Sequence, residues 1–104
     1  MDRVRSDDLL DRIAIEYDQD RGFIGKVRLG QFDEVALGRL LSALRECPSA
    51  GEELMNPGMV RLLWWMPWIV EWQVQRLGSD RPADQLRRAH SAIFGELERI
   101  LGVA

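Results

Sequence analysis

Apolar positions recur at helical spacing over three long stretches of this chain. Between residues 57 and 77, one side of a helix wound at about 100° per residue is almost wholly aliphatic. Asn56 supplies an N-cap, Pro57 the first helical position and Gly78 the end. Pro67 lies inside and predicts a kink or a division into two helices. The aliphatic positions are Met59, Val60, Leu62, Leu63, Met66, Ile69, Val70, Val74 and Leu77.

The other two stretches predict one helix before residues 57–77 in the sequence and one helix after them. Residues 31–47 form a helix that Pro48 stops, and residues 48–56 follow as a connector. Ser79 and Asp80 open a helix that runs from about Pro82 until Gly102 ends it. Its apolar arc follows the spacing of an amphipathic helix and contains Leu86, Ala89, Ile93, Phe94, Leu97, Ile100 and Leu101. The arc of residues 31–47 contains Phe32, Val35, Ala36, Leu37, Leu40, Leu41, Ala43 and Leu44.

The first thirty residues fit two patterns. Ser6 begins an acidic N-cap sequence, after which apolar residues from Leu9 to Tyr17 share one helix face. Residues 13–17 and 23–29 also alternate like strands, and residues 18–22 between them have turn chemistry. Both a β-hairpin and a helix followed by an extended segment therefore remain open here.

All four tryptophans lie on the side of helix 57–77 that the aliphatic residues leave free. Arg61, Gln75 and Arg76 fall among them. A helix that is apolar on both sides must be covered on both sides. The N-terminal segment could lie over the indoles, or a protein partner or a second copy of the chain could. Membrane-interface binding is disfavoured, because the flanks lack the enrichment in Lys and Arg of a surface-binding helix.

We expect part of this tryptophan side to remain at the surface or in a homodimer contact. A thirty-residue segment provides little material to cover four indoles, and Trp and Arg are enriched at interface hot spots. Trp65 or Trp72, near the two arginines, are the tryptophans we expect to stay exposed. The candidate interface consists of Arg61, Trp64, Trp65, Trp68, Trp72 and Arg76.

Length and composition favour one soluble domain spanning residues 1–104. Hydrophobic residues make up 46% of the chain and charged residues 30%, which is a composition typical of a globular domain. The longest apolar run, residues 62–70, is much shorter than a membrane span. Cys47 is the single cysteine and the N-terminus has no apolar signal region, so we expect a cytoplasmic location.

No catalytic, cofactor or metal motif stands out. His90, the only histidine, falls in the apolar arc of the last helix, where a core histidine bonded to a carbonyl or carboxylate is the favoured interpretation. Cys47 lies on the apolar side of its helix and is expected to be an inert core thiol. Glu16, Asp18 and Asp20 precede Gly22, but their spacing does not fit an EF-hand, so they are expected to be turn carboxylates.

Charge argues against a nucleic-acid partner. The net charge is −3, and the most basic segment, residues 57–104, has only six basic residues against five acidic ones. Nucleic-acid binding normally needs a stronger basic field. Arg81, Arg87 and Arg88 could contact phosphates from the start of the last helix, although an exposed basic edge is the simpler interpretation.

These patterns predict a mainly α fold of three to four helices, with either a β-hairpin or a short helix at the N-terminus packed on the central tryptophan-rich helix. The function expected is non-enzymatic: a small cytosolic protein that binds or masks another protein, as inhibitors, antitoxins, immunity proteins and small subunits do. One alternative is a small-molecule-binding protein or enzyme with a pocket between helices near His90. Another is a nucleic-acid-associated regulator that uses Arg81, Arg87 and Arg88. No cofactor is expected.

Overall fold

The computed structural model describes residues 2–48, 57–78 and 81–102, without the side chains of residues 2–7 and 81–82. These residues are mainly α-helical. The elements are α1 (Asp2–Ala14), a 3-10 turn η1 (Ile15–Tyr17), α2 (Phe23–Arg28), α3 (Glu34–Glu46), α4 (Pro57–Leu77) and α5 (Arg81–Leu101). The mainly α prediction is confirmed. The β-hairpin is wrong, since no strand occurs in these residues.

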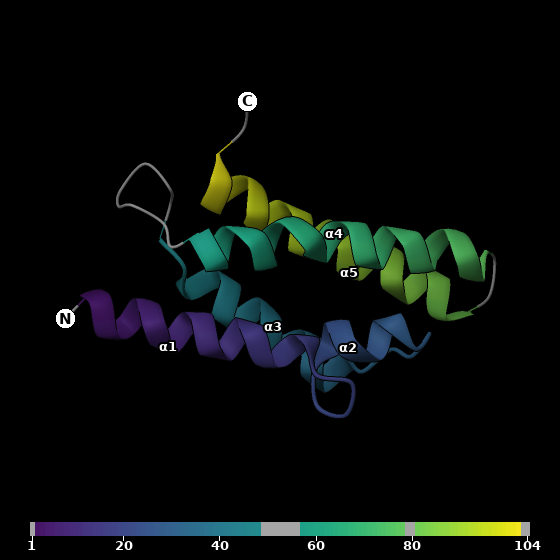
Figure 1. Cartoon of the computed structure of the whole chain (residues 1–104). Helices are drawn as coiled ribbons and strands as arrows, with labels where there is room; N and C mark the ends of the chain where they lie inside the picture. Colours follow the sequence, from purple (N-terminus) through teal and green to yellow (C-terminus); the bar gives the residue numbers. More distant parts are fainter. Residues whose placement is uncertain (1, 49–56, 79–80, 103–104) are drawn as a thin grey trace.

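The helices form a four-cornered bundle in which α1 and α2 follow one another along one edge (Figure 1). The α1–α2 edge contacts α3 and α4, and α5 completes the bundle by contacting the same two helices. The contact between α4 and α5 is the most extensive. The molecule measures 44 × 31 × 19 Å, and its shortest dimension corresponds to about two helix diameters of roughly 10 Å each.

The aliphatic side of α4 faces the centre of the bundle, as the spacing predicts, except that Val60 near its start is 38% exposed. Leu63, Met66 and Val70 have no exposed surface, and Ile69 is nearly as well buried. The predicted arc of α5 is also largely buried, but Phe94 is half-exposed. On α3 the predicted arc includes one error, because Val35 is 80% exposed. Core residues from the other helices are Leu9, Ile13, Phe23, Ile24, Val27, Leu40, Leu44, Leu86, Ile93, Leu97 and Ile100.

A buried carboxylate explains why residues 15–29 form a turn and a short helix instead of a hairpin. Glu16 is 1% exposed, and its Oε1 accepts a hydrogen bond from the backbone N–H of Phe23 at 2.9 Å. Phe23 is the first residue of α2, so the carboxylate satisfies a donor that the helix itself leaves free. Arg39 of α3 donates to the same carboxylate from Nε at 2.6 Å and from Nη2 at 3.1 Å.

Two glycines allow α2 to lie against this turn. A Cβ atom at Gly22 would lie 2.2 Å from the carbonyl oxygen of Glu16. One at Gly25 would lie 2.1 Å from the carbonyl oxygen of Asp18. Both distances are far inside van der Waals contact with backbone atoms, so only glycine fits at either position.

Several predicted helix ends differ from those observed. α1 begins at Asp2, so Ser6 lies within a helix and is not its N-cap. α3 begins at Glu34 instead of residue 31, because Asp33 caps it by accepting from the N–H of Ala36 at 3.0 Å. Pro67 does not divide α4, which is continuous from Pro57 to Leu77. The predicted caps Asn56, Ser79 and Asp80 lie outside the described residues.

Arg99 of α5 stabilises the end of α3. Its Nη1 donates to the carbonyl of Cys47 at 2.9 Å, and its Nη2 donates to the carbonyl of Leu44 at 2.8 Å. The last carbonyls of a helix have no partner within the helix, and a cation is the favourable neighbour for them. This contact therefore joins α3 to α5, which pack on each other.

Candidate functional site

The four tryptophans of α4 lie at the surface of the molecule. Trp64, Trp65, Trp68 and Trp72 are each between 53% and 76% exposed, with Trp72 the most exposed. The N-terminal helices do contact α4, but they leave these indoles uncovered. The interpretation in which the N-terminal segment covers the tryptophans is therefore wrong, and the expectation that some of them remain at the surface is confirmed. The tryptophan face is defined here as these four residues with Arg61 and Arg76, both of which are also exposed.

Two indoles of this face contact each other. The ring centroids of Trp64 and Trp68 are 6.5 Å apart with the planes tilted by 54°, which is within the range of favourable aromatic pairs. Trp64, Trp68 and Trp72 follow one another at intervals of four residues, about one helical turn, so the indoles form a row along α4. Large aromatic side chains with few rotatable bonds offer contact area at a low cost in conformational entropy.

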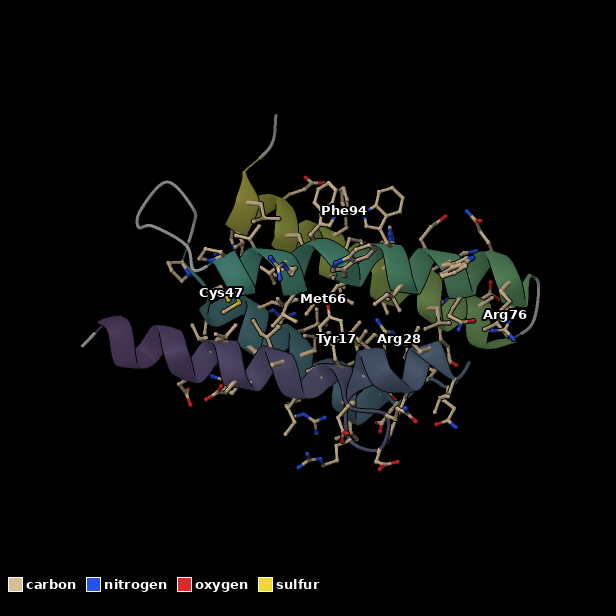
Figure 2. All side chains as sticks on the ribbon, viewed as in Figure 1. Tyr17, Arg28, Cys47, Met66, Arg76 and Phe94 are labelled. Atoms are coloured by element: carbon tan, nitrogen blue, oxygen red, sulfur yellow. The ribbon has the colours of Figure 1, made fainter. Side chains whose placement is uncertain are left out.

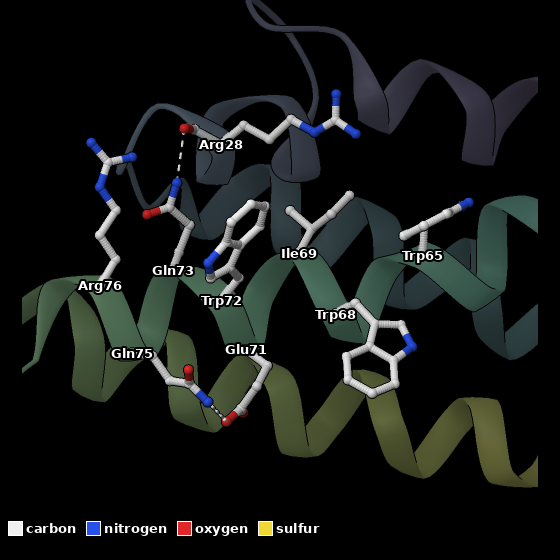
Figure 3. A pocket seen from close by; sticks show the side chains of 9 residues that line it. All are labelled: Arg28, Trp65, Trp68, Ile69, Glu71, Trp72, Gln73, Gln75 and Arg76. Atoms are coloured by element: carbon white, nitrogen blue, oxygen red, sulfur yellow. Dashed lines mark hydrogen bonds between the residues drawn. The ribbon is translucent and has the colours of Figure 1, made fainter.

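A groove of about 930 Å³ lies along one side of this row, between α4 and the end of α2 (Figure 3). We call it the α2–α4 groove. Its aromatic wall is formed by three of the tryptophans, and its polar groups include two arginines. The lining residues are Arg28, Trp65, Trp68, Ile69, Glu71, Trp72, Gln73, Gln75 and Arg76.

Gln73 ties the two sides of this groove together. Its Nε2 donates to the carbonyl of Arg28, the last residue of α2, at 2.8 Å. The Gln73 side chain is nearly buried, and its Oε1 has no hydrogen-bond partner within the described part of the chain. In Figure 3 that oxygen points to the side where Arg76 stands.

Tyr17 anchors Arg28 and the N-terminal helices on α4. Its hydroxyl donates to the backbone carbonyl of Leu62, and the Arg28 guanidinium lies 6.0 Å from the centre of its ring. Figure 2 shows Tyr17 between the N-terminal helices and α4. Burial raises the pKa of Tyr17 above its ordinary value, and the positive charge of Arg28 opposes part of that rise.

A second hollow, of about 420 Å³, lies on the other side of the row, between α4 and α5. Most of its lining is apolar, and His90 and Glu71 are among its polar groups. His90 is partly buried, stacks on Phe94 with ring centroids 5.9 Å apart, and places Nε2 3.9 Å from the Glu71 carboxylate. The Glu71 carboxylate of α4 is therefore near His90, but 3.9 Å is too long for the hydrogen bond expected of a core histidine, and His90 is only partly buried. The lining residues are Leu63, Trp64, Pro67, Trp68, Glu71, His90, Phe94, Leu97, Glu98, Leu101 and Gly102.

The remaining candidates for chemistry have structural contacts. Cys47 is buried, its Sγ lies 3.5 Å from the carbonyl of Ala43, and burial raises the pKa of its thiol. Of the acidic cluster, Glu16 is the buried cap of α2, whereas Asp18 pairs with Arg21 across the turn at 2.9 Å. The prediction of a turn role holds for Asp18 but misses the burial of Glu16. Among the described side chains, no group of three or more His, Cys, Asp and Glu could hold a metal ion.

The arginines considered for phosphate binding do not form a free cluster. Arg87 Nη1 pairs with Asp84 at 2.6 Å, and its Nη2 donates to the carbonyl of Gly78. Arg88 is exposed, and the side chain of Arg81 lies outside the described part. The start of α5 therefore offers one described arginine, Arg88, without an internal partner.

Comparisons with protein-family models, curated proteins and solved structures find no match for this chain. None of the helices in the described residues has both the length and the apolar character that crossing a membrane requires.

Arg28, Gln73 and Phe94 belong to the site but were not identified from the sequence. Phe94 had the spacing of a core residue and lines the α4–α5 hollow instead. Arg28 and Gln73 are far apart in the chain and meet only because α2 packs on α4. One sequence signal could have indicated the contact between Gln73 and Arg28: Gln73 is a polar residue next to the inward, apolar side of its helix.

Proposed function

We propose that this protein is a non-enzymatic interaction module that binds or masks another protein through the tryptophan face. Inhibitors, antitoxins, immunity proteins and small subunits act in this way. The proposal rests on one observation: all four tryptophans are more than half exposed on one side of a helix whose other side packs into the core. We place the protein in the cytoplasm, because its single cysteine is a buried free thiol and suits a reducing compartment.

The area of the face is in the range that binding surfaces need. At roughly 250 Å² for each tryptophan side chain, exposure at the observed fractions leaves about 600 Å² of indole surface in contact with water. The largest apolar patch of a typical monomer is roughly 300–600 Å² and is often functional. A standard interface buries about 800 Å² per partner, and the half-exposed Phe94 extends the surface toward that size.

A different protein or a second copy of this chain could cover such a face. In a two-fold dimer with antiparallel α4 helices centred on Trp68, Trp64 of one copy would lie opposite Trp72 of the other. A parallel pair would instead oppose Arg61 with Arg61 and Arg76 with Arg76, at an electrostatic cost. The antiparallel arrangement is therefore the homodimer that we propose as the second form of the same function.

Affinity capture with purified full-length chain, followed by reconstitution, tests the proposal. A captured protein should be purified and should bind wild-type chain in a defined ratio. Binding should be lost on Trp72→Ala and kept on Val35→Ala, a control on α3 that is 80% exposed. If the two variants bind equally, the tryptophan face is not the binding surface.

The α4–α5 hollow supports a second candidate, a small-molecule-binding function near His90. Its volume of about 420 Å³ is within the roughly 300–1,000 Å³ range of ligand sites. A thermal-shift screen with apolar and aromatic carboxylic acids should then find ligands that stabilise wild-type protein and lose their effect on His90→Gln. Ligands that stabilise both proteins equally would place binding elsewhere.

A further inference from the structure

Three of the arginines that have no carboxylate partner among the described residues lie around the tryptophan face. Arg28, Arg61 and Arg76 form no ion pair with any described carboxylate, and Arg88 is the single other described arginine side chain of which this is true. Each remaining arginine side chain in the described part pairs with a carboxylate of the chain. These are Arg12, Arg21, Arg39, Arg45, Arg87 and Arg99.

The α2–α4 groove therefore carries positive charge in a chain whose net charge is −3. Arg28 and Arg76 line it, and Glu71 is the one acidic residue among the lining groups. That carboxylate already accepts a hydrogen bond from Gln75 at 3.2 Å. An aromatic wall bordered by two arginines without carboxylate partners is complementary to a ligand that is both apolar and acidic.

We propose that the α2–α4 groove binds an acidic amphipathic helix of a partner protein. Large apolar side chains of that helix pack on Trp65, Trp68 and Trp72, and its flanking Asp or Glu side chains pair with Arg28 and Arg76. This is the mode in which an amphipathic helix places anchors at positions i, i+3 or i+4, and i+7 in a groove. The inference rests on the proposed function and specifies the chemistry of the partner.

Gln73 gives the groove a fixed shape before any partner arrives. Its amide N–H group holds the carbonyl of Arg28, so the end of α2 stays in place beside α4. The unpartnered Oε1, on the Arg76 side of the groove, is a buried acceptor that lacks a donor among the described residues. A buried acceptor without a donor is costly, so the groove offers a bound partner one hydrogen-bond acceptor in addition to its two arginines.

Charge also argues against three other occupants of the groove: a second copy of the chain, an anionic membrane and a nucleic acid. A second copy would add its own Arg28, Arg61 and Arg76 to the interface, so the positive charge around the groove would increase and would not be neutralised. An anionic membrane would repel a chain with a net charge of −3 as a whole, and a hollowed surface inserts poorly into a bilayer. A nucleic acid at this face would meet three arginines that have no carboxylate partner among the described residues, fewer than the six to ten phosphate contacts typical of salt-dependent binders.

A selection experiment with full-length chain tests the inference directly. The probe is a displayed library of helical peptides about 18 residues long, with large apolar residues at i, i+3, i+4 and i+7 and random residues at the flanks. We expect enriched binders to carry a net negative charge at the flanks. Their affinity should fall about tenfold with Arg28→Glu and about tenfold with Arg76→Glu, the factor for one charge-assisted contact.

A matched control and a charge swap sharpen the test. Arg88→Glu reverses an equally unpaired arginine outside the groove and should leave affinity unchanged. Selection against the double variant Arg28→Glu/Arg76→Glu should enrich Lys- and Arg-rich flanks instead. Circular dichroism verifies that each variant is folded before binding is measured.

Failure of this inference is distinguishable from failure of the proposed function. Binders that are lost on Trp72→Ala but carry neutral or basic flanks would overturn the acidic partner and leave the tryptophan face as a binding surface. The absence of any binder sensitive to Trp72→Ala would overturn both. Phosphatidylserine vesicles that bind the chain through its tryptophans, or a tight dimer in sedimentation that acidic peptides do not dissociate, would assign the face to those occupants and overturn the inference as well.

Discussion

Replacing the buried carboxylate of Glu16 with an amide should destabilise the whole N-terminal half of the bundle. Glu16→Gln keeps the size of the side chain but removes its charge. The carboxylate accepts three hydrogen bonds, one from the Phe23 N–H and two from Arg39. An amide in its place would present an NH₂ group to at least one of these donors, so at least one buried donor would lose its acceptor.

The size of the expected loss in the free energy of unfolding follows from the burial of Glu16 and of Arg39. Hydrogen bonds to a charged group contribute about 1.5–3 kcal/mol each, and Glu16 is almost fully buried. Arg39 is about half exposed, so its guanidinium regains water in the variant and only part of its contribution is lost. We therefore expect Glu16→Gln to lower the free energy of unfolding by about 2–4 kcal/mol.

The assay is urea denaturation followed by far-ultraviolet circular dichroism. Tryptophan emission is a poor probe here, because the indoles are already exposed in the folded chain. Glu34→Gln, an exposed glutamate in the first turn of α3, is the matched control and should change stability by less than about 0.5 kcal/mol. A double-mutant cycle of Glu16→Gln with Arg39→Gln should give a coupling of about 1–3 kcal/mol. A loss below about 1 kcal/mol for Glu16→Gln, or no coupling, would refute this account of the turn.

Three further predictions concern the packing of α2, the core side of α4 and the burial of Tyr17. Gly25→Ala should cost at least about 2 kcal/mol, because its Cβ would meet a backbone carbonyl, whereas Gly38→Ala in an open position of α3 should stabilise by about 0.5–1 kcal/mol; equal effects in thermal melts would disprove the close contact. Leu63→Ala should cost about 2–5 kcal/mol through a cavity in the core, and a loss under 1 kcal/mol on denaturation would make α4 peripheral. Because the folded state raises the pKa of Tyr17, stability should be intact below the unfolded pKa near 10 and should fall as pH rises above it. Tyr17 is the one tyrosine, so tyrosinate absorbance reports it alone; a normal titration in the folded chain would contradict its burial.

Hydrophobic spacing was enough to predict the long helices and their inward sides. α4 and α5 have 21 residues each, so the 3.6-residue period repeats often enough to identify the buried stripe. α2 has six residues, too few for a period to appear, and its alternating residues resembled a strand. α2 is held as a helix by the hydrogen bond from its first N–H to Glu16 and by the close backbone approach that Gly22 and Gly25 allow. Both are contacts between residues that come together only in the folded chain.

The composition of the tryptophan face was visible in the sequence, but its environment was not. A helix that is apolar on both sides indicates that something covers each side, without indicating which molecule does so. The spacing predicted that Arg61 and Arg76 share the side of the indoles, and both are exposed on the same helix. The groove could not be predicted, because it requires Arg28 from α2 and the bond from Gln73 that keeps α2 beside α4.

Acrylamide quenching of the intrinsic tryptophan fluorescence, measured on full-length chain over a range of concentrations, tests the exposure of the tryptophan face most directly. At submicromolar concentration, where no partner is present, all four indoles should emit at the long wavelength of exposed tryptophan and should be quenched as one accessible population. A peptide or protein that binds the face should shield them, and Trp72→Ala should weaken that shielding. A blue-shifted emission with indoles protected from quencher in the dilute, monomeric chain would show that the face is part of the core, and the proposed binding surface would not exist.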